Sequence, residues 1–299
     1  MKRTVLVLAA ALLVAAAMTT NAFARHDAAP PTLKAGVLTV GLSLQVPGFQ
    51  VGTIYGGNKI KNAKGMEPEL AKAIAKKLGI AKVEFINNDF QTMYAPGPKK
   101  WDFGFAEMTI TEERKGNIDF STPYLQADQS LMVRKGLSPL PKSTADVRKL
   151  VLCAQTGTTG ADFIKGKIKP TTTPLFPKNT EQMYTLVRSG KCDGALYDAP
   201  INGLESKSKP GKYGPIVARY KTGELYGAPF AKGSKMLPLV NAALKALIAD
   251  GTVGKLAKQY LNFDASKIPV FKFETRKRGG SRSSLPPRIS HDRHREHHR

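Results

Sequence analysis

The sequence has 299 residues, of which 41% are hydrophobic, and a formal net charge of +23 at pH 7. This length and apolar content are enough for two ordinary domains, each with its own core, and they exclude a wholly disordered chain. The positive charge is unevenly distributed, because residues 272–299 are rich in Arg, Lys and His and contain few apolar side chains. We expect residues 272–299 to be a disordered basic tail.

The N-terminus has the three parts of a secretory signal peptide. Lys2 and Arg3 precede an apolar run from Val5 to Met18, and residues 22–24 form a small-x-small cleavage site. We predict that residues 1–24 are a cleaved signal peptide and that the mature chain is soluble and periplasmic. An uncleaved anchor is the alternative, but the apolar run of about 14 residues is shorter than the roughly 20 that a membrane-spanning helix needs.

Export also bears on the partner of the basic tail. Lys and Arg neutralise phosphates, but an exported protein rarely meets nucleic acid, so we expect no nucleic-acid partner. Anionic lipid head groups or cell-envelope polymers are better candidates, and a solvated tail without any partner is a further one.

Short apolar runs alternate with helical patterns along the rest of the chain. The runs that predict strands are residues 37–42, 83–86, 103–105, 130–133, 150–154 and 194–197. Helices are predicted at residues 67–78, from Thr111, from about Thr159, at 180–189, and as a final pair within 237–260. Pro47 and several glycines predict a loop between the first strand and the first helix. This alternation indicates an α/β architecture with mainly parallel sheets.

The first of these helices has the clearest pattern. Leu70, Ile74 and Leu78 recur every four residues, which places them on one helical face. Pro68 suits the first turn, and Gly79 can adopt the left-handed conformation that ends a helix.

One polar loop, residues 109–114, precedes a predicted helix, at a position where α/β folds bind ligands. Thr111 is a candidate N-cap, and Arg114 follows one turn later. Its guanidinium group could bind a carboxylate through two parallel hydrogen bonds. Alternatively, Arg114 is a surface residue that pairs with Glu113.

Two further loops follow predicted strands. Gly157 and Thr158 lie in a loop at a helix start, where free backbone N–H groups can bind an anion, although a simple capped turn has the same sequence pattern. Asp198 ends an apolar strand and could accept an ammonium group or cap the next turn. An arginine, a set of N–H donors and an aspartate together are what a small zwitterion requires.

Other chemistry has no sequence support. We find no paired carboxylates, no Ser/His/Asp set, no metal-ligand spacing and no phosphate-binding glycine loop, so we expect no catalytic residue, cofactor or metal site. Cys153 and Cys192 form an even count in an exported chain, which favours a disulfide, with two buried thiols as the alternative.

Several ordered motifs resemble the amino-acid-binding branch of the bacterial periplasmic solute-binding proteins, family 3. The motifs are residues 38–41, 65–74, 108–114, 119–124, 157–159, 193–198 and 241–260. The resemblance implies a type II periplasmic binding protein fold. Lobe 1 would comprise residues 33–127 and 226–265 and lobe 2 residues 128–225, with two hinge strands between them. It further implies a monomer that captures an amino acid and delivers it to the permease of an ABC transporter.

The resemblance also assigns roles to individual residues. Arg114 resembles the carboxylate-binding arginine, Thr109 a residue that contacts the ligand, and Asp198 the acceptor of its ammonium group. Thr159, with the adjacent Gly157 and Thr158, resembles the helix-start donor. Some branches of the family pair cysteines at positions similar to Cys153 and Cys192.

Two departures from the family pattern affect the ligand side chain. Many relatives have an aromatic residue near Val46 that covers the ligand side chain, and here the nearby aromatic residue is Phe49, which is the candidate for this contact. Glu107 stands where many relatives have a small residue, and it could face a cationic side chain, point to solvent or pair with a lysine. The alternative function is a lyase-type enzyme on the same scaffold, with Glu107 as the acid.

Overall fold

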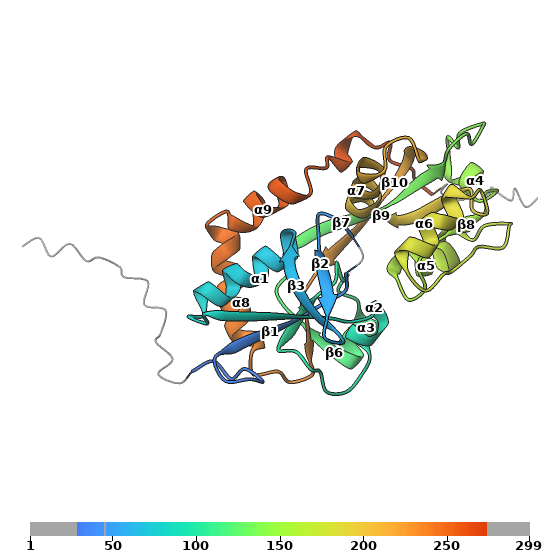
Figure 1. Ribbon diagram of the computed structural model, residues 1–299. Helices are drawn as coiled ribbons and strands as arrows, with labels where there is room; N and C mark the ends of the chain where they lie inside the picture. Colours follow the sequence, from blue (N-terminus) through green and yellow to red (C-terminus); the bar gives the residue numbers. More distant parts are fainter. Residues whose placement is uncertain (1–28, 45, 274–299) are drawn as a thin grey trace, which may run out of the picture.

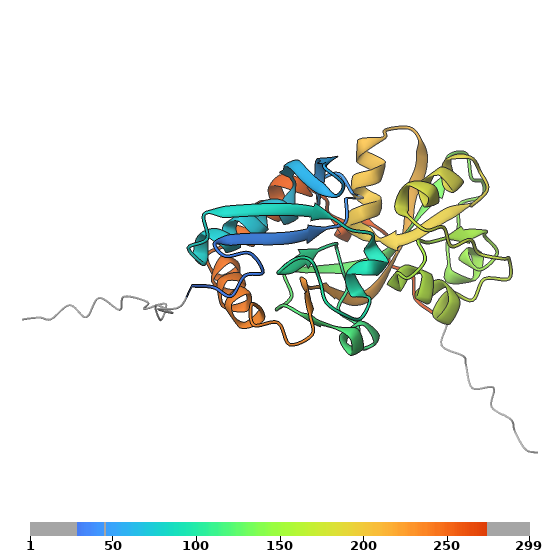
Figure 2. The ribbon, with the colours of Figure 1, turned by 60° about the horizontal axis from the view of Figure 1, so that its bottom comes forward.

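The computed structural model describes residues 29–44 and 46–273. The predicted signal peptide and the predicted basic tail from residue 274 onward lie outside the described residues. Two lobes lie side by side and are connected by two long antiparallel strands, β7 (Leu125–Arg134) and β10 (Tyr213–Tyr226) (Figure 1 and Figure 2). Within the described part of the chain, no helix has the length and apolar character needed to cross a bilayer.

The first lobe contains a five-stranded sheet in the order β2-β3-β4-β1-β5. Its strands are β1 (Val37–Leu42), β2 (Val51–Tyr55), β3 (Lys59–Lys64), β4 (Lys82–Asn87) and β5 (Phe103–Phe105). A short sheet pairs β6 (Ile118–Phe120) with β11 (Pro229–Ala231). The helices are α1 (Met66–Lys77), α2 (Phe90–Tyr94), α3 (Glu112–Asn117), α8 (Leu237–Ala249) and α9 (Thr252–Tyr260).

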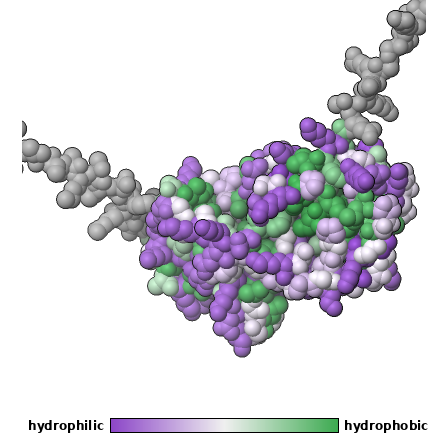
Figure 3. Space-filling view, turned by 90° about the horizontal axis from the view of Figure 1, so that it is seen from above, coloured by the Kyte–Doolittle hydropathy of each residue, from purple (hydrophilic) through white to green (hydrophobic). Residues whose placement is uncertain are grey.

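The second lobe contains a four-stranded sheet in the order β10-β7-β9-β8, with β8 (Leu152–Cys153) and β9 (Gly194–Asp198). Its helices are α4 (Thr144–Val147), α5 (Thr159–Phe163), the π-helix η1 (Ile164–Ile168), α6 (Thr180–Arg188) and α7 (Ala199–Ser208). Seen from above, hydrophobic side chains gather over this lobe, while the other lobe is mostly hydrophilic (Figure 3).

The predicted helix at residues 67–78 is α1, and its sequence signals act as expected. Leu70 and Ile74 are fully buried against the sheet, and the polar face is turned to solvent. Gly79 has φ 70°, the left-handed conformation expected beyond a helix end.

The α/β fold is confirmed, but the prediction of mainly parallel sheets is wrong. In the first lobe, β1 is parallel to β4 and β5, while β2–β3 and β3–β4 are antiparallel. In the second lobe, β8–β9 is the parallel pair, and β7 is antiparallel to both neighbours. The reason is that β7 enters the second lobe and β10 leaves it, so these long strands run in opposite directions.

The hairpin of β2 and β3 occupies much of the segment that was predicted to be a loop. All residues of β2 are exposed. Because neither face of the strand is buried, its sequence has no alternation of apolar and polar residues. The strand is stabilised by backbone pairing with β3, and a periodicity analysis cannot detect it.

The described C-terminal segment returns to the second lobe after α9, beyond the short helix η2 (Ala265–Lys267) (Figure 1, red). The backbone of Arg219 donates to Pro269 O and accepts from Phe271 N. Phe273 stacks on Tyr220, with 5.7 Å between ring centroids. Residues 272 and 273 were predicted to belong to the tail, but they pack against the second lobe through these aromatic contacts and a hydrogen bond from the Thr144 hydroxyl to Lys272 O.

Both cysteines are buried free thiols, so the structure has the alternative arrangement and not the predicted disulfide. The Cys153 thiol donates to Gly194 O at 3.6 Å. Hydrogen bonding with Cys192, followed by burial, raises the pKa of Cys153. These thiols act as packed core groups in this structure.

Candidate functional site

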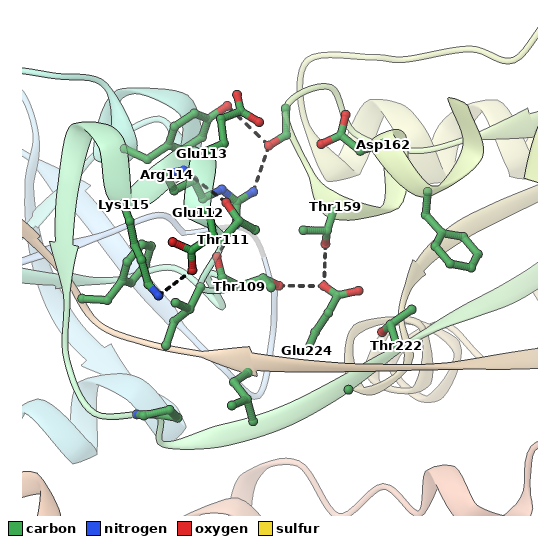
Figure 4. Close-up of a pocket in the computed structure, with 18 of the residues that line it drawn as sticks. Thr109, Thr111, Glu112, Glu113, Arg114, Lys115, Thr159, Asp162, Thr222 and Glu224 are labelled. Atoms are coloured by element: carbon green, nitrogen blue, oxygen red, sulfur yellow. Dashed lines mark hydrogen bonds and ion pairs between the residues drawn. The ribbon is translucent and has the colours of Figure 1, made fainter. Parts of the chain in front are cut away.

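Two adjoining hollows lie between the lobes. The first is an enclosed pocket of about 10 Å³, which is room for about one water molecule. Both lobes line it, with Val46, Phe90, Ala106, Glu107, Thr109, Arg114, Thr158, Thr159, Tyr197, Asp198 and Ile201. The second is an open groove of about 1490 Å³ beside it (Figure 4). Thr109, Arg114 and Thr159 line both hollows and therefore separate the pocket from the groove.

Arg114 forms the positive end of this site. The Thr111 hydroxyl caps α3 by accepting a hydrogen bond from Arg114 N at 3.2 Å, which places the arginine in the first turn. Its guanidinium group donates to Thr109 O at 2.7 Å and to Gly157 O at 3.0 Å, so it joins the two lobes. Burial lowers the pKa of Arg114, but a guanidinium group remains charged in proteins.

Two aromatic rings hold the same guanidinium group. Its central carbon lies 5.2 Å from the ring centroid of Phe90 and 5.1 Å from that of Tyr94, both on α2. These rings favour the cation and restrict its position. No ion pair of Arg114 with a carboxylate is found among the described residues, so its charge is free to bind an anionic group.

Glu224 lies at the boundary between pocket and groove (Figure 4). One oxygen of its carboxylate accepts hydrogen bonds from the hydroxyls of Thr109 at 2.8 Å and Thr159 at 2.6 Å. The other accepts from Gln129 Nε2 at 3.0 Å. Since Thr109 belongs to the first lobe and Thr159 to the second, one carboxylate connects both lobes.

Asp198 lies in the enclosed pocket at the end of β9. Its carboxylate accepts from Gln129 Nε2 at 2.6 Å and from the hydroxyl of Tyr226. Burial, followed by the negative charge of Glu224, raises the pKa of Asp198 to about 7. The side chain can therefore exist in either protonation state near neutral pH, and a nearby cation would favour the ionised form.

Glu107 forms the negative end together with Glu67. The carboxyl group of Glu67 accepts from Glu107 N at 3.0 Å and from the side chains of Tyr124 and Gln50. Burial raises the pKa of Glu67 to about 7. Burial, with the charges of Glu67 and Asp198 as further causes, raises the pKa of Glu107 well above its ordinary value.

The backbone of Glu107 is unusual. Its φ of 45° lies in the left-handed region, which costs free energy for a residue with a side chain. The residue is also buried, with 7% of its surface exposed. A strained backbone and a buried carboxyl group at one position point to a functional role.

The structure brings most of the predicted site residues together. Six of them line the enclosed pocket: Glu107, Thr109, Arg114, Thr158, Thr159 and Asp198. The carbonyl of Gly157 faces Arg114. The Thr158 hydroxyl caps α5 by accepting from Ala161 N, so it has a structural bond already.

Phe49 is the exception, because it lines neither the pocket nor the groove. It is fully buried and packs edge-on against Tyr226, with 6.1 Å between ring centroids. Val46 lines the pocket in its place. Phe49 therefore contributes to the core behind the site, and the expected aromatic contact with a ligand side chain is corrected accordingly.

Sequence reasoning missed four polar residues of the site: Glu67, Gln129, Glu224 and Tyr226. Glu67 lies in the first turn of α1, where a carboxylate suits the helix dipole, so its sequence position gives no sign of a role in the site. Gln129 and Glu224 lie in the hinge strands, and neither has a local pattern that separates it from a surface residue. Only the pairing of β7 with β10 brings them together.

The sequence matches the family model described as bacterial extracellular solute-binding proteins, family 3, over residues 38–263. The chain belongs to this family. That match spans both lobes and includes every residue of the site described above.

Individual family 3 relatives agree with this assignment. The glutamine-binding protein GlnH of an ABC transporter of Bacillus subtilis is 31% identical over 208 residues, which are 68% of this chain and 75% of GlnH. The structure of an ancestral arginine-binding protein bound to glutamine is 34% identical with a TM-score of 0.67, covering 77% of this chain and all of that one.

A third similar structure is the ancestral amino acid-binding protein AncCDT-1, described as a precursor of cyclohexadienyl dehydratase. It is 31% identical with a TM-score of 0.65 and covers 76% of this chain and 95% of that one. The type II fold is therefore shared with amino acid-binding proteins. In this chain the pocket has Arg114 at its positive end and Glu107 at its negative end, with Asp198 also in its lining.

Proposed function

We propose that this family 3 protein binds an amino acid with a positively charged side chain and delivers it to an ABC importer. The observation that carries the proposal is Glu107, a buried carboxyl group with a left-handed backbone in the wall of the pocket. A glycine would avoid both the backbone strain and the burial of a carboxyl group. The side chain therefore has to contribute something that offsets these costs, and pairing with a cation of the ligand would do so.

The charges of the site support an arrangement of the whole ligand. Arg114 would bind the α-carboxylate, for which its guanidinium group offers two parallel donors. Asp198 would accept the α-ammonium group, and Glu107 would pair with the cationic side chain. With these three contacts, each charge of a basic amino acid meets an opposite charge of the protein.

The size of the pocket supports a binding mechanism that includes lobe movement. A volume of about 10 Å³ cannot hold an amino acid, so the lobes must separate before a ligand can enter. The flexible connection is formed by β7 and β10, and separation would break the bond between Arg114 and Gly157. Closure around a ligand would then give the transporter a loaded shape to recognise.

Calorimetric titration against the common amino acids tests the proposal. The protein is unfolded and refolded first, so that co-purified ligand is removed. We expect arginine or lysine to bind more tightly than glutamine. A clear preference for neutral or acidic amino acids would contradict the assignment of Glu107, and no binding across the whole panel would contradict the amino acid function.

The variant Glu107→Gln isolates the cation contact. It keeps the size of the side chain and removes the charge, so affinity for the cationic ligand should fall by about tenfold while affinity for glutamine stays within about twofold. Glu113→Gln is the matched control, because Glu113 is an exposed carboxylate one residue from Arg114. An equal loss for both ligand types would mean that Glu107 supports the fold and not the ligand charge.

A lyase-type enzyme is the second candidate function. It is supported by the raised pKa of Glu107, which would let this carboxyl group act as a general acid, and by the description of AncCDT-1 as a precursor of a dehydratase. The relatives named above are binding proteins, and this favours binding without turnover. Release of product from small carboxylate substrates, abolished in Glu107→Gln, would establish the enzyme.

The cellular context is part of the same proposal. The predicted signal peptide at residues 1–24 supports export to the periplasm, and the family supports an ABC transporter permease as partner. We propose that the mature protein acts as a monomer. N-terminal sequencing of the protein isolated from the periplasm, together with its mass in solution, tests both points.

A further inference from the structure

The hydrogen bonds of Glu224 use groups that a ligand would need. The resemblance to the family assigns the hydroxyl of Thr109 and the helix-start N–H of Thr159 to ligand binding, and in the structure the hydroxyls of both residues donate to Glu224 Oε2, at 2.8 and 2.6 Å. A carboxylate of the protein thus lies against two residues that are expected to contact a ligand. Burial lowers the pKa of Arg114, and the charge of Glu224 is among the charges that partly offset this lowering.

The hinge strand is built to bring Glu224 to this position. Between Tyr220 and Glu224 the pairing of β10 with β7 shifts register, because Tyr220 pairs with Gln129 while Glu224 pairs with Ala127. Residues 221–223 therefore bulge out of the ladder, and bulges redirect side chains. Gly223 has φ 67° and donates its N–H to Asp128 at 3.1 Å, which holds the bulge.

The arrangement also connects the lobes. Thr109 follows β5 in the first lobe, Thr159 begins α5 in the second, and Glu224 lies on the strand between them (Figure 4). Together with the bond from Arg114 to Gly157, these contacts separate the pocket from the groove. Breaking the contacts of Glu224 would remove one of the polar connections that keep the lobes together.

The hydrogen bonds around Glu224 would allow its carboxylate to move away when a ligand binds. Gln129 Nε2 has two hydrogens but lies within hydrogen-bond distance of Thr159, Asp198 and Glu224, at 3.3, 2.6 and 3.0 Å. Its Oε1 atom is buried and accepts no hydrogen bond among the described residues. Three acceptors thus share two hydrogens, and movement of Glu224 toward the groove would leave one hydrogen each for Thr159 and Asp198.

We propose that Glu224 is an internal competitor of the ligand, whose carboxylate binds the Thr109 and Thr159 hydroxyls and holds the lobes together until a ligand carboxylate displaces it. This inference rests on the proposed amino acid function. According to this inference, a residue of the hinge strand β10 controls the affinity for the amino acid. The ligand has to displace Glu224 before it can bind, so the measured affinity is lower than that of a site without this carboxylate.

The first test measures affinity. In titrations of the refolded protein with its best amino acid, Glu224→Ala should bind about threefold or more tightly than the wild type, because only the competent fraction binds ligand. Glu112→Gln is the control, since Glu112 lines the same groove but its carboxylate is exposed and pairs with Lys115. Unchanged affinity of Glu224→Ala would overturn the proposal. Weaker binding would overturn it too, because it would make Glu224 a ligand contact.

The second test needs no ligand. Spin labels at Lys115 and Lys167, exposed residues on the two walls of the groove, report the distance between the lobes. In refolded protein without ligand, Glu224→Ala should shift the distance distribution to longer values, and Glu112→Gln should not. An unchanged distribution would overturn the role of Glu224 in holding the lobes.

The two proposals can fail separately. If the wild-type protein binds none of the amino acids, the proposed function fails, and the distance measurement still decides whether Glu224 holds the lobes together. If the wild type binds and Glu224→Ala has the same affinity, only the internal competitor is rejected. Glu224→Gln, which keeps the shape of the side chain, replaces the alanine variant if that variant melts at a markedly lower temperature.

Discussion

The positive and negative ends of the site stabilise buried charge in different ways. Arg114 is held by two carbonyl oxygens and two aromatic rings, all of which favour its charged form. Glu107 has the opposite environment, because burial, followed by the negative charges of Glu67 and Asp198, raises its pKa and favours its protonated form. The positive end is thus ready for an anion, whereas the negative end has to lose a proton to become an anion itself.

This difference teaches how the site can select a ligand. A carboxylate can bind to Arg114 without any change of protonation. A cation beside Glu107 has to favour ionisation of a buried carboxyl group, and only a ligand with a positive group there can do so. The positive end would therefore accept any amino acid, and the negative end would discriminate among side chains.

The largest expected effect is at the positive end. Arg114→Ala should weaken amino acid binding by at least about tenfold, since loss of one partner of a desolvated ion pair costs about 2 to 5 kcal/mol. The measurement is calorimetric titration, with Lys115→Ala as a control at the next residue, whose side chain is exposed and pairs with Glu112. Equal affinity of Arg114→Ala and wild type would place the ligand carboxylate elsewhere.

A smaller effect is expected at the negative end, where the raised pKa of Glu67 should make the free energy of unfolding depend on pH. The pKa of Glu67 is about 7 in the folded protein and near 4.5 when unfolded, so the unfolded state releases its proton first as the pH rises. This should lower the free energy of unfolding by about 2 kcal/mol between pH 5 and pH 7.5. Urea unfolding across this range measures the slope.

Glu67→Gln removes this titration and should reduce the pH dependence of unfolding by about this amount, while Asp198, whose pKa is also raised, still contributes. Glu69→Gln is the matched control on the same helix, because its carboxylate is partly exposed and pairs with Lys72. If Glu67→Gln keeps the slope of the wild type, the burial of this carboxyl group has no effect on stability, and the contrast between the two ends would be lost.

The smallest effect concerns Asp198, which lies in the same pocket as both ends. Binding of an ammonium group requires the ionised carboxylate, whose pKa is about 7. Affinity should therefore fall by about fivefold from pH 7 to pH 6, as the ionised fraction decreases. Titrations at several pH values test this, and Asp198→Asn should bind weakly with little pH dependence.

Glu224→Gln sharpens the same measurement. The charge of Glu224 is one cause of the raised pKa of Asp198, so its removal should move the pH dependence of binding to lower pH. A curve that stays at the position of the wild type would show that burial alone controls the protonation of Asp198.

Local sequence was sufficient where one segment contains the whole signal. The apolar period of four residues and Gly79 determined α1, and continuous apolar runs determined β1 and β9. Thr111 as a cap determined that Arg114 lies in the first turn of α3. These features depend on side chains that are near one another along the chain, and a sequence pattern records them directly.

Tertiary structure decided what depends on distant segments. The pairing of β7 with β10 gave the sheets their mixed direction and brought Gln129 next to Glu224, residues 95 positions apart. Packing directed Phe49 into the core and left Val46 at the pocket. The sequence by itself therefore determined the lobes' main elements and Arg114 as the carboxylate-binding candidate. The long-range pairing decided the buried acids around it, because their pKa values depend on burial and on charges that only the folded chain brings together.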